Sequence, residues 1–227
     1  MIEPVSEDAV LITLAQAIDD TLPARIAGLT DSIRGAGFHW LVDIVPSYTT
    51  LMVVYDPLII DFRRVVSGLR PLIELDRSCD RAPTLDGRLV ELPVYYSTET
   101  GPDLQELASE SGLDCEEVIR RHSSVEYRVH ALGFAPGFAF MGQVDSSIAA
   151  SRKTSPRKQV PAGSVGIANR QTAVYPQASP GGWQLIGRCP TPLFDPAKLS
   201  LLKVGDRVRF TPITREAFLA AGGELTP

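Results

Sequence analysis

Three segments rich in glycine and proline are the parts of this sequence best suited to bind a ligand. They are residues 133–138 (GFAPGF), 160–166 (VPAGSVG) and 179–188 (SPGGWQLIGR). Neighbouring glycines let backbone N–H groups point into a cavity, where they can hold a carboxylate, a phosphate or a carbonyl oxygen that gains charge. Prolines beside them fix the loops before binding and so lower the ordering cost of binding. The alternative is that these residues only turn corners in a β-rich domain.

The same segments and the strands between them supply the side chains that such a pocket would use. The residues expected to line it are Phe134, Gly137, Gly163, Ser164, Gln171, Tyr175, Ser179, Gly181, Gly182 and Trp183. Arginine suits a carboxylate or a phosphate because its planar guanidinium offers paired donors. Arg157 and Arg188 are therefore the candidates for holding an anion. Arg157 belongs to a basic segment, 152–158, for which a solvated loop is the alternative.

His122 is the candidate acid or base among the three histidines. It ends a predicted helix, where a protonated imidazole would favour the negative end of the helix dipole, so a structural role is the alternative. His130 lies in an alternating run and is expected to face away from Val129. With Arg157 and Arg188, His122 completes the set of residues predicted to be catalytic.

Several familiar sites are excluded because their residues are missing. The sequence has no Gly-Lys pair, so it has no P-loop, and no GxGxxG stands between a strand and a helix. Ser164 lies in Gly-Ser-Val-Gly, which lacks both the glycine spacing and the following helix of a nucleophile elbow. Three cysteines and three histidines show no ligand spacing, so neither a disulfide nor a metal site is expected.

A β-rich domain must position these segments. From residue 127 to 210, short runs with β propensity are broken by Gly or Pro every few residues, which is typical of a sandwich or barrel. Within the run from Trp183, strict alternation would place Gln184, Ile186 and Arg188 on one face. An upstream strand, 89–96, contains Pro93, which favours an edge position.

Two short helices are predicted between that edge strand and the β-rich region. The first covers 103–111 and ends at Gly112. The second begins after Asp114, which with Glu117 forms an Asp variant of the capping box. Both belong to the segment that leads into the β-rich region.

The first 75 residues predict a separate α/β unit with the order βαββα. Its strands are expected at 9–14, 40–45 and 50–55 and its helices at 21–33, capped by Asp19, Asp20 or Thr21, and around 62–69. Residues 76–88 are polar and contain Pro and Gly, so they predict a linker. The expected class is α+β, with an N-terminal α/β domain (1–75), a linker (76–88) and a C-terminal domain (89–227).

Composition indicates an ordinary globular protein. Of the 227 residues, 44% are hydrophobic and 22% charged, and the net charge of -5 argues against a nucleic-acid partner, which requires a basic face. No apolar run approaches the roughly 18 residues of a membrane span. The start MIEPVSEDAV lacks the features of a signal peptide. We expect a cytoplasmic protein with a small-molecule substrate and no membrane partner.

The combination of 132–142 (LGFAPGFAFMG), 154–168 (TSPRKQVPAGSVGIA) and 179–188 (SPGGWQLIGR) resembles the family of 5-oxoprolinase B subunits. This family is also called allophanate hydrolase subunit 1 and includes the kinase inhibitor KipI. The resemblance is strong over about 89–212 and loose over the first 75 residues. It implies a C-terminal domain of cyclophilin-like β-barrel form and a partner chain of the C type, which is KipA-like. With a third, A-type chain, that pair hydrolyses 5-oxoproline to glutamate at the expense of ATP.

The resemblance also implies how the chemistry would be divided. The lactam of 5-oxoproline is an unstrained amide, so opening it requires activation, for which phosphorylation of its oxygen is one route. Backbone donors of 163–166 and 179–182 would stabilise the anionic oxygen, and Arg157 or Arg188 would hold the carboxylate or phosphate. The partner chain would complete the site and share the ATP site.

Two other functions fit the same resemblance. One is a KipI-like inhibitor of a histidine kinase, and the other is the carboxyltransferase half of a urea carboxylase or allophanate-type system, which takes a carboxyl group from carboxybiotin. The sequence departs from the family pattern at 138–143 (FAFMGQ) and at Asn169-Arg170 before Gln171. These loops are the ones expected to meet the substrate, so the substrate's identity stays open.

Overall fold

The computed structural model describes residues 1–17, 21–78 and 87–225. The chain divides into two compact units, Met1–Gly87 and Arg88–Pro227. Each unit has its own hydrophobic core. The division falls in the segment 76–88, of which 79–86 lie outside the described residues.

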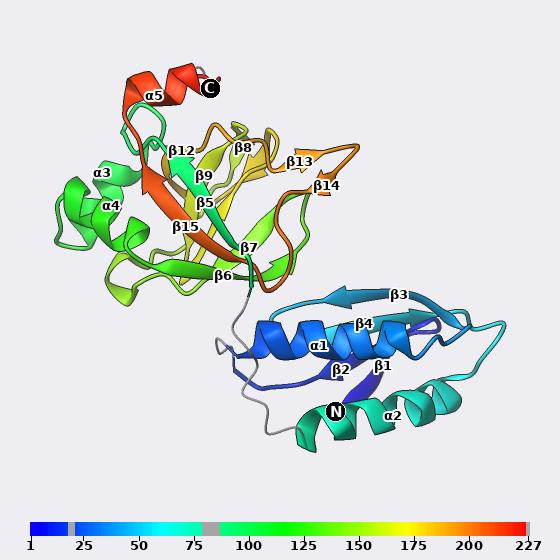
Figure 1. Cartoon of the computed structure of the whole chain (residues 1–227). Helices are drawn as coiled ribbons and strands as arrows, with labels where there is room; N and C mark the ends of the chain where they lie inside the picture. The colour runs from blue at the N-terminus through cyan, green and yellow to red at the C-terminus, as the bar shows by residue number, and fades with distance from the viewer. Residues whose placement is uncertain (18–20, 79–86, 226–227) are drawn as a thin grey trace. The chain divides into compact units, whose positions relative to one another are not determined.

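The first unit is an antiparallel sheet of four strands with two helices (Figure 1). The sheet order is β1-β2-β4-β3. The elements are β1 (Ile2–Ser6), β2 (Ala9–Thr13), α1 (Leu22–Gly35), β3 (Leu41–Pro46), β4 (Thr50–Tyr55) and α2 (Phe62–Ser78). Ile26, Leu29 and Ile33 recur at helical spacing on α1 and are buried in this core.

Three expectations for this unit need correction or fall outside the description. Strand β1 was missed, because four of its five residues are exposed and it contains Pro4, so it lacks the signal of a buried strand. Helix α2 runs to Ser78 rather than ending before 76, since Ile73 is buried in the core and Asp76 forms a 2.7 Å ion pair with Arg25 of α1. The expected caps Asp19 and Asp20 lie outside the described residues.

The second unit contains a sheet of seven strands in the order β12-β9-β10-β7-β6-β15-β5. Figure 1 labels its two edge strands, β5 and β12. The strands of this sheet are β5 (Leu89–Val94), β6 (Glu126–Leu132), β7 (Ala139–Gly142), β9 (Ser164–Ala168), β10 (Gln171–Val174), β12 (Gln184–Arg188) and β15 (Arg207–Pro212). Strand β5 is an edge strand, as Pro93 predicts, and pairs in parallel with β15. Just past β5, Tyr95 exchanges two backbone hydrogen bonds with Arg188 of the other edge strand, so the sheet nearly closes into a barrel. The expected α+β class with a β-barrel is confirmed.

Smaller elements join or follow these strands. They are α3 (Leu104–Glu110), α4 (Cys115–Ser123), a 3-10 turn (Ser146–Ile148), the pair β8 (Arg157–Val160) and β11 (Ser179–Gly181), the pair β13 (Phe194–Asp195) and β14 (Leu199–Ser200), and α5 (Arg215–Ala220). Asp114 caps α4 by accepting a 2.7 Å hydrogen bond from the Glu117 N–H, so the predicted cap is confirmed. Helix α5 was not predicted.

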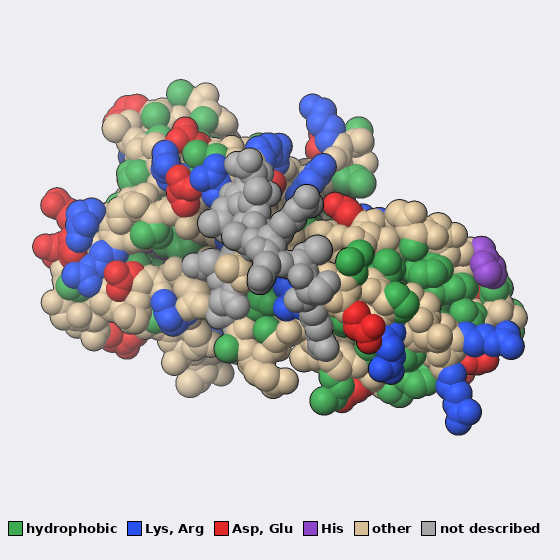
Figure 2. Space-filling view, turned by 60° about the horizontal axis from the view of Figure 1, so that its bottom comes forward, with side chains coloured by type: hydrophobic (Ala, Val, Ile, Leu, Met, Phe, Trp, Pro, Cys, Tyr) green, Lys and Arg blue, Asp and Glu red, His purple; other side chains and the backbone are tan. Residues whose placement is uncertain are grey.

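The barrel sheet contributes to two hydrophobic clusters. The main core includes Val165, Ile167 and Ile186, and a second, aromatic cluster includes Ala168, Trp183 and Leu185. On the face of the molecule that Figure 2 shows, acidic and basic side chains of the described residues are intermixed over both units. This mixture agrees with the small net charge of the chain.

Candidate functional site

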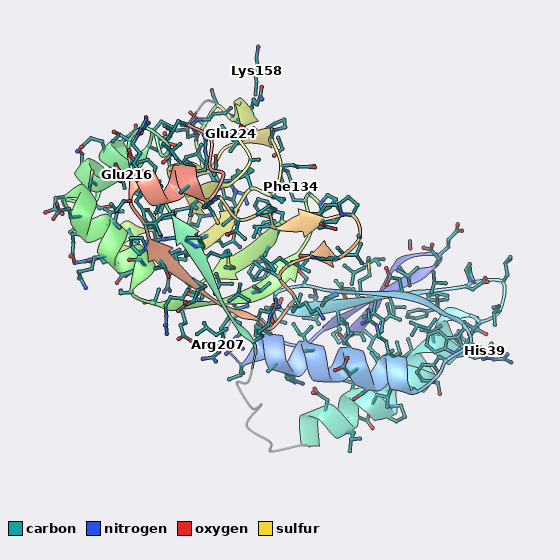
Figure 3. All side chains as sticks on the ribbon, turned by 45° about the horizontal axis from the view of Figure 1, so that its top comes forward. His39, Phe134, Lys158, Arg207, Glu216 and Glu224 are labelled. Atoms are coloured by element: carbon teal, nitrogen blue, oxygen red, sulfur yellow. The ribbon has the colours of Figure 1, made fainter. Side chains whose placement is uncertain are left out.

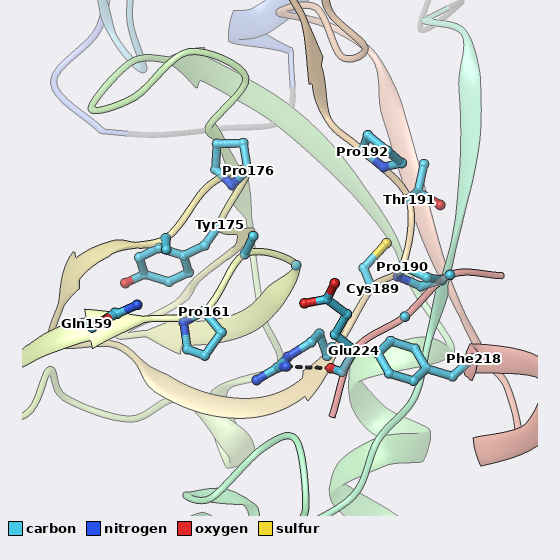
Figure 4. A pocket seen from close by; sticks show the side chains of 16 residues that line it. Gln159, Pro161, Tyr175, Pro176, Cys189, Pro190, Thr191, Pro192, Phe218 and Glu224 are labelled. Carbon is cyan, nitrogen blue, oxygen red and sulfur yellow. Dashed lines mark hydrogen bonds between the residues drawn. The ribbon is translucent and has the colours of Figure 1, made fainter. Parts of the chain in front are cut away.

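One candidate site is a cavity of about 450 Å³ in the second unit, which we call the Arg188 pocket (Figure 4). Its walls come from β8 and the loop before β9, the segment after β10, the end of β12 with the loop that follows, and α5 with the segment after it. The lining residues are Gln159, Pro161, Ala162, Gly163, Tyr175, Pro176, Ala178, Arg188, Cys189, Pro190, Thr191, Pro192, Phe218, Gly222, Gly223 and Glu224.

An irregularity in β12 directs Arg188 into this pocket. Leu185 pairs with Gly166, but Gly187 pairs with Val165, so Ile186 is an extra residue in the ladder. Arg188 lines the pocket, whereas Ile186 is buried in the main core. The expectation that Ile186 and Arg188 share a face was wrong, because a bulge shifts the alternation by one residue.

Arg188 is nearly buried, with 6% of its surface exposed. Its Nη1 donates a 2.6 Å hydrogen bond to the backbone carbonyl of Glu224. Burial lowers the pKa of Arg188, an effect that the nearby Glu224 opposes. A buried guanidinium beside a cavity is a suitable partner for a carboxylate or phosphate.

Gly163 forms the wall of the pocket next to Arg188, and only glycine fits there. Its φ is 79°, and a Cβ on this residue would lie 2.3 Å from the Cys189 carbonyl oxygen. The N–H of Gly163 donates to the Tyr175 carbonyl, and that of Ser164 donates to the Pro161 carbonyl. The expectation that this segment offers free donors to an oxyanion was therefore wrong for these two residues, since both N–H groups donate within the chain.

Ser164 lies next to Gly163 of the pocket wall. It is fully buried, and its hydroxyl has no hydrogen-bond partner among the described residues. Opposite it in the ladder stands Arg188. Paired strand positions thus carry a buried hydroxyl and a nearly buried guanidinium.

A second cavity, of about 300 Å³, lies beside the aromatic cluster, and we call it the Trp183 pocket. Its lining residues are Phe134, Phe138, Phe140, Arg152, Lys153, Pro156, Tyr175, Pro180, Gly181, Gly182 and Trp183. Phe138 makes edge-to-face contacts with Tyr175 and Trp183 at ring distances of 5.3 and 5.6 Å. Phe134, labelled in Figure 3, is 67% exposed.

Tyr175 separates the two pockets, because it lines both. A Cβ on Gly181 would lie 2.4 Å from the Tyr175 hydroxyl oxygen, so glycine is required where β11 passes the ring. Trp183 is 5% exposed and belongs to the aromatic cluster while it also lines the second cavity. Trp183 is therefore both a core residue and part of the pocket wall that the sequence predicted.

Arg157 lines neither pocket in the described part of the chain. Its Nη2 donates to the Asp103 carboxylate at 2.6 Å, and Lys153 approaches the same oxygen at 2.9 Å. Asp103 is buried and also accepts from the backbone N–H of Leu185. Arg157 therefore neutralises a buried carboxylate, which corrects its expected role of holding a substrate anion. Lys158, next in the same segment, points away from the barrel (Figure 3).

His122 is a core residue. It is fully buried, its ring stacks on Phe210 at 4.7 Å, and it lines neither pocket in the described chain. The Thr172 hydroxyl donates to the Gly166 carbonyl, so it accepts from Nε2 of His122, and the Tyr96 hydroxyl donates to Nδ1. Burial lowers the pKa of His122 to about 3. The imidazole is thus neutral, and the expected roles as catalytic acid or base and as a charged helix cap are corrected.

The structure divides the predicted site residues between the two pockets. Gly163, Tyr175 and Arg188 line the first, and Phe134, Tyr175, Gly181, Gly182 and Trp183 line the second. Gly137, Ser164, Gln171 and Ser179, all described, line neither. Sequence reasoning missed Phe218 and Glu224, because the C-terminal segment carries no local motif that signals a pocket wall, and it missed Cys189, which directly follows the motif 179–188.

No group of three or more His, Cys, Asp or Glu side chains among the described residues is placed to hold a metal ion. No helix in the described ranges has the length and apolar character needed to cross a membrane.

The chain matches known proteins over most of its length. A family model described as "Carboxyltransferase domain, subdomain C and D" matches residues 1–202. The 5-oxoprolinase B subunit of Bacillus subtilis (strain 168) is 38% identical over 229 residues, which is 96% of this chain and 95% of that protein.

Solved structures agree in fold. TTHA0988 has a TM-score of 0.79 at 35% identity, covering 94% of this chain, which spans only 40% of that longer one. The urea carboxylase of Kluyveromyces lactis has a TM-score of 0.74 over 96% of this chain and 22% of its own, and at 17% identity this likeness concerns the fold alone.

Proposed function

The chain belongs to the carboxyltransferase-domain family whose curated relatives are 5-oxoprolinase B subunits, and from this membership we propose that it is the B subunit of an ATP-dependent 5-oxoprolinase. One observation carries the proposal beyond the family. It is the nearly buried guanidinium of Arg188, held at the wall of a cavity of about 450 Å³. Such a cavity is large enough for a small ligand, and the guanidinium supplies the charge that a carboxylate requires.

In this proposal Arg188 binds the carboxylate of 5-oxoproline. Gly163 leaves space beside the guanidinium, and the prolines of the lining hold the walls in place. The lactam ring then lies in the cavity toward Tyr175, another residue of the lining. The chain contributes binding and orientation of the substrate.

The remaining chemistry is assigned to a partner. Burial raises the pKa of Cys189 and of Tyr175, so neither group is ionised at neutral pH. Glu224 is an exposed residue of the lining. Because opening an unstrained amide requires activation, we propose that a C-type partner chain completes the site and shares the ATP site.

Reconstitution tests this function. The chain, a C-type partner and an A-type partner are combined, and glutamate release from 5-oxoproline is measured with and without ATP. We expect ATP-dependent release from the complete set and none from the single chain. Turnover by the single chain refutes the need for partners, and an inactive complete complex of folded chains refutes the function.

Carboxyl transfer is the second candidate, favoured by the description of the family model and by the fold of urea carboxylase. In that case the carboxylate bound at Arg188 would be an acceptor or product of carboxybiotin chemistry. The test is transfer of labelled carboxyl from a carboxybiotin carrier to a small amide. Transfer in the absence of 5-oxoproline turnover would select this candidate over the first.

A further inference from the structure

The segment that follows α5 forms part of the wall of the Arg188 pocket. Residues 222–224, which we call the C-terminal strap, line the pocket together with Phe218 of α5 (Figure 4). Phe218 is fully buried and anchors the helix, with its ring 5.6 Å from that of Tyr95. The strap itself lies at the surface, because Gly222 and Glu224 are exposed. The buried side chain of Phe218 is thus followed by an exposed segment that covers the pocket.

The strap binds the guanidinium of Arg188, the group that a carboxylate ligand would need. Nη1 of Arg188 donates to the Glu224 backbone carbonyl at 2.6 Å, the contact drawn as a dashed line in Figure 4. A carbonyl is a neutral acceptor, and hydrogen bonds become stronger when donor and acceptor are both charged. A carboxylate that reaches Arg188 can therefore displace this carbonyl.

The strap can bend at Gly222, at the end of α5. Gly222 has a φ of 84°, and its N–H and that of Gly223 donate to the Leu219 and Phe218 carbonyls at the end of α5. These two bonds hold the start of the strap to the helix. The Arg188 contact lies beyond them, at Glu224. Opening at Glu224 therefore breaks the Arg188 hydrogen bond while α5 and its cap stay in place.

A buried polar group near Arg188 also has an unsatisfied hydrogen-bonding capacity. The buried hydroxyl of Ser164, opposite Arg188 in the ladder, has no hydrogen-bond partner among the described residues. An unsatisfied buried hydroxyl carries a free-energy cost that a new partner can remove. Ser164 is not part of the pocket lining, so this hydroxyl lies behind the wall at Gly163, where a polar group stays unsatisfied while the strap is closed.

We propose that the C-terminal strap is a competitive cover of the Arg188 pocket, whose Glu224 carbonyl occupies the position that a small carboxylate takes when the strap opens. This inference rests on the proposed function for the identity of the natural ligand, 5-oxoproline. The strap itself is judged with a simpler carboxylate, acetate. It regulates the site by lowering its affinity for carboxylates in the closed state.

The test uses the chain truncated after Ala221 and the full chain. Phenylglyoxal, which reacts with arginine, is applied to both, and modification of Arg188 is followed by peptide mass spectrometry. We expect faster modification of Arg188 in the truncated chain, and protection by acetate at a concentration at least about fivefold lower than in the full chain. Arg152, which lines the other pocket, is the internal control and should react equally in both.

A second measurement covers the case in which truncation unfolds α5. In the full chain, amide hydrogen exchange of residues 222–225 should rise when acetate is added, while that of 215–220 stays unchanged. The proposal is overturned if acetate protects Arg188 equally in the folded truncated chain and the folded full chain, or if hydrogen exchange of residues 222–225 does not rise. If acetate behaves as expected and 5-oxoproline protects Arg188 no better than acetate, the strap stands and the proposed substrate fails.

Discussion

Replacement of His122 by Gln should remove most of the pH dependence of stability that this residue gives the second unit between pH 7.5 and 5. The imidazole is fully buried between Tyr96 and Thr172 and neutral, with a pKa of about 3 compared with 6.5 for an unperturbed histidine. In the unfolded chain it takes up a proton near pH 6.5. The folded state resists protonation until about pH 3, so acid favours unfolding.

The magnitude follows from this difference. Stability from the neutral imidazole is fully present above pH 6.5 and falls by about 1.4 kcal/mol for each pH unit below it, until the folded pKa near 3 is reached. Between about pH 7.5 and 5 the loss is roughly 2 kcal/mol. Glutamine has no proton to gain, so the variant is less stable at pH 7.5, where it loses the stacking on Phe210, but it lacks this slope.

Urea unfolding followed by tryptophan fluorescence measures the effect. The chain has two tryptophans, and a Trp40→Phe background leaves Trp183 to report on the second unit. The difference in unfolding free energy between the parent chain and His122→Gln should shrink by roughly 2 kcal/mol from about pH 7.5 to about pH 5. His39→Gln, at an exposed histidine of the first unit, is the matched control and should keep the full slope.

One result would refute the reasoning. If His122→Gln and the parent chain lose stability in parallel as the pH falls, then His122 is not held neutral by burial. A catalytic role for this residue would then be open again. Parallel curves for the parent chain and His39→Gln are expected in either case.

Three further predictions concern the two pockets. Trp183→Ala should destabilise the second unit by roughly 3–5 kcal/mol, because it empties the space beside Phe138 and Tyr175. Urea unfolding followed by circular dichroism should show a much smaller loss for Trp183→Phe. Arg188→Lys should keep its melting temperature within a few degrees of the parent while activity of the reconstituted complex falls at least roughly tenfold, about 1.4 kcal/mol; unchanged activity would remove Arg188 from the site. Gly163→Ala should lower the melting temperature, since the new Cβ would lie 2.3 Å from a carbonyl oxygen at a positive φ, and an unchanged melting temperature would show that the wall of the pocket relaxes freely.

Local signals in the sequence determined many of the elements and the class of the fold. The cap at Asp114, the edge position of Pro93 and the helical spacing of Ile26, Leu29 and Ile33 all appear in the structure. Each depends on residues a few positions apart, so the pattern and its physical cause lie in the same short segment. The motif at 179–188 likewise indicated the family and drew attention to Arg188.

Only the tertiary structure decided what each candidate residue does. Arg157 pairs with Asp103, 54 residues away, and Arg188 donates to Glu224, 36 residues away. The bulge at Ile186 turns Arg188 to the pocket face. The N–H groups of Gly163 and Ser164 donate to backbone carbonyls of the chain. Ion pairs, strand register and burial join distant parts of the chain, and the free energy of a charge or a donor depends on these neighbours and not on its own segment.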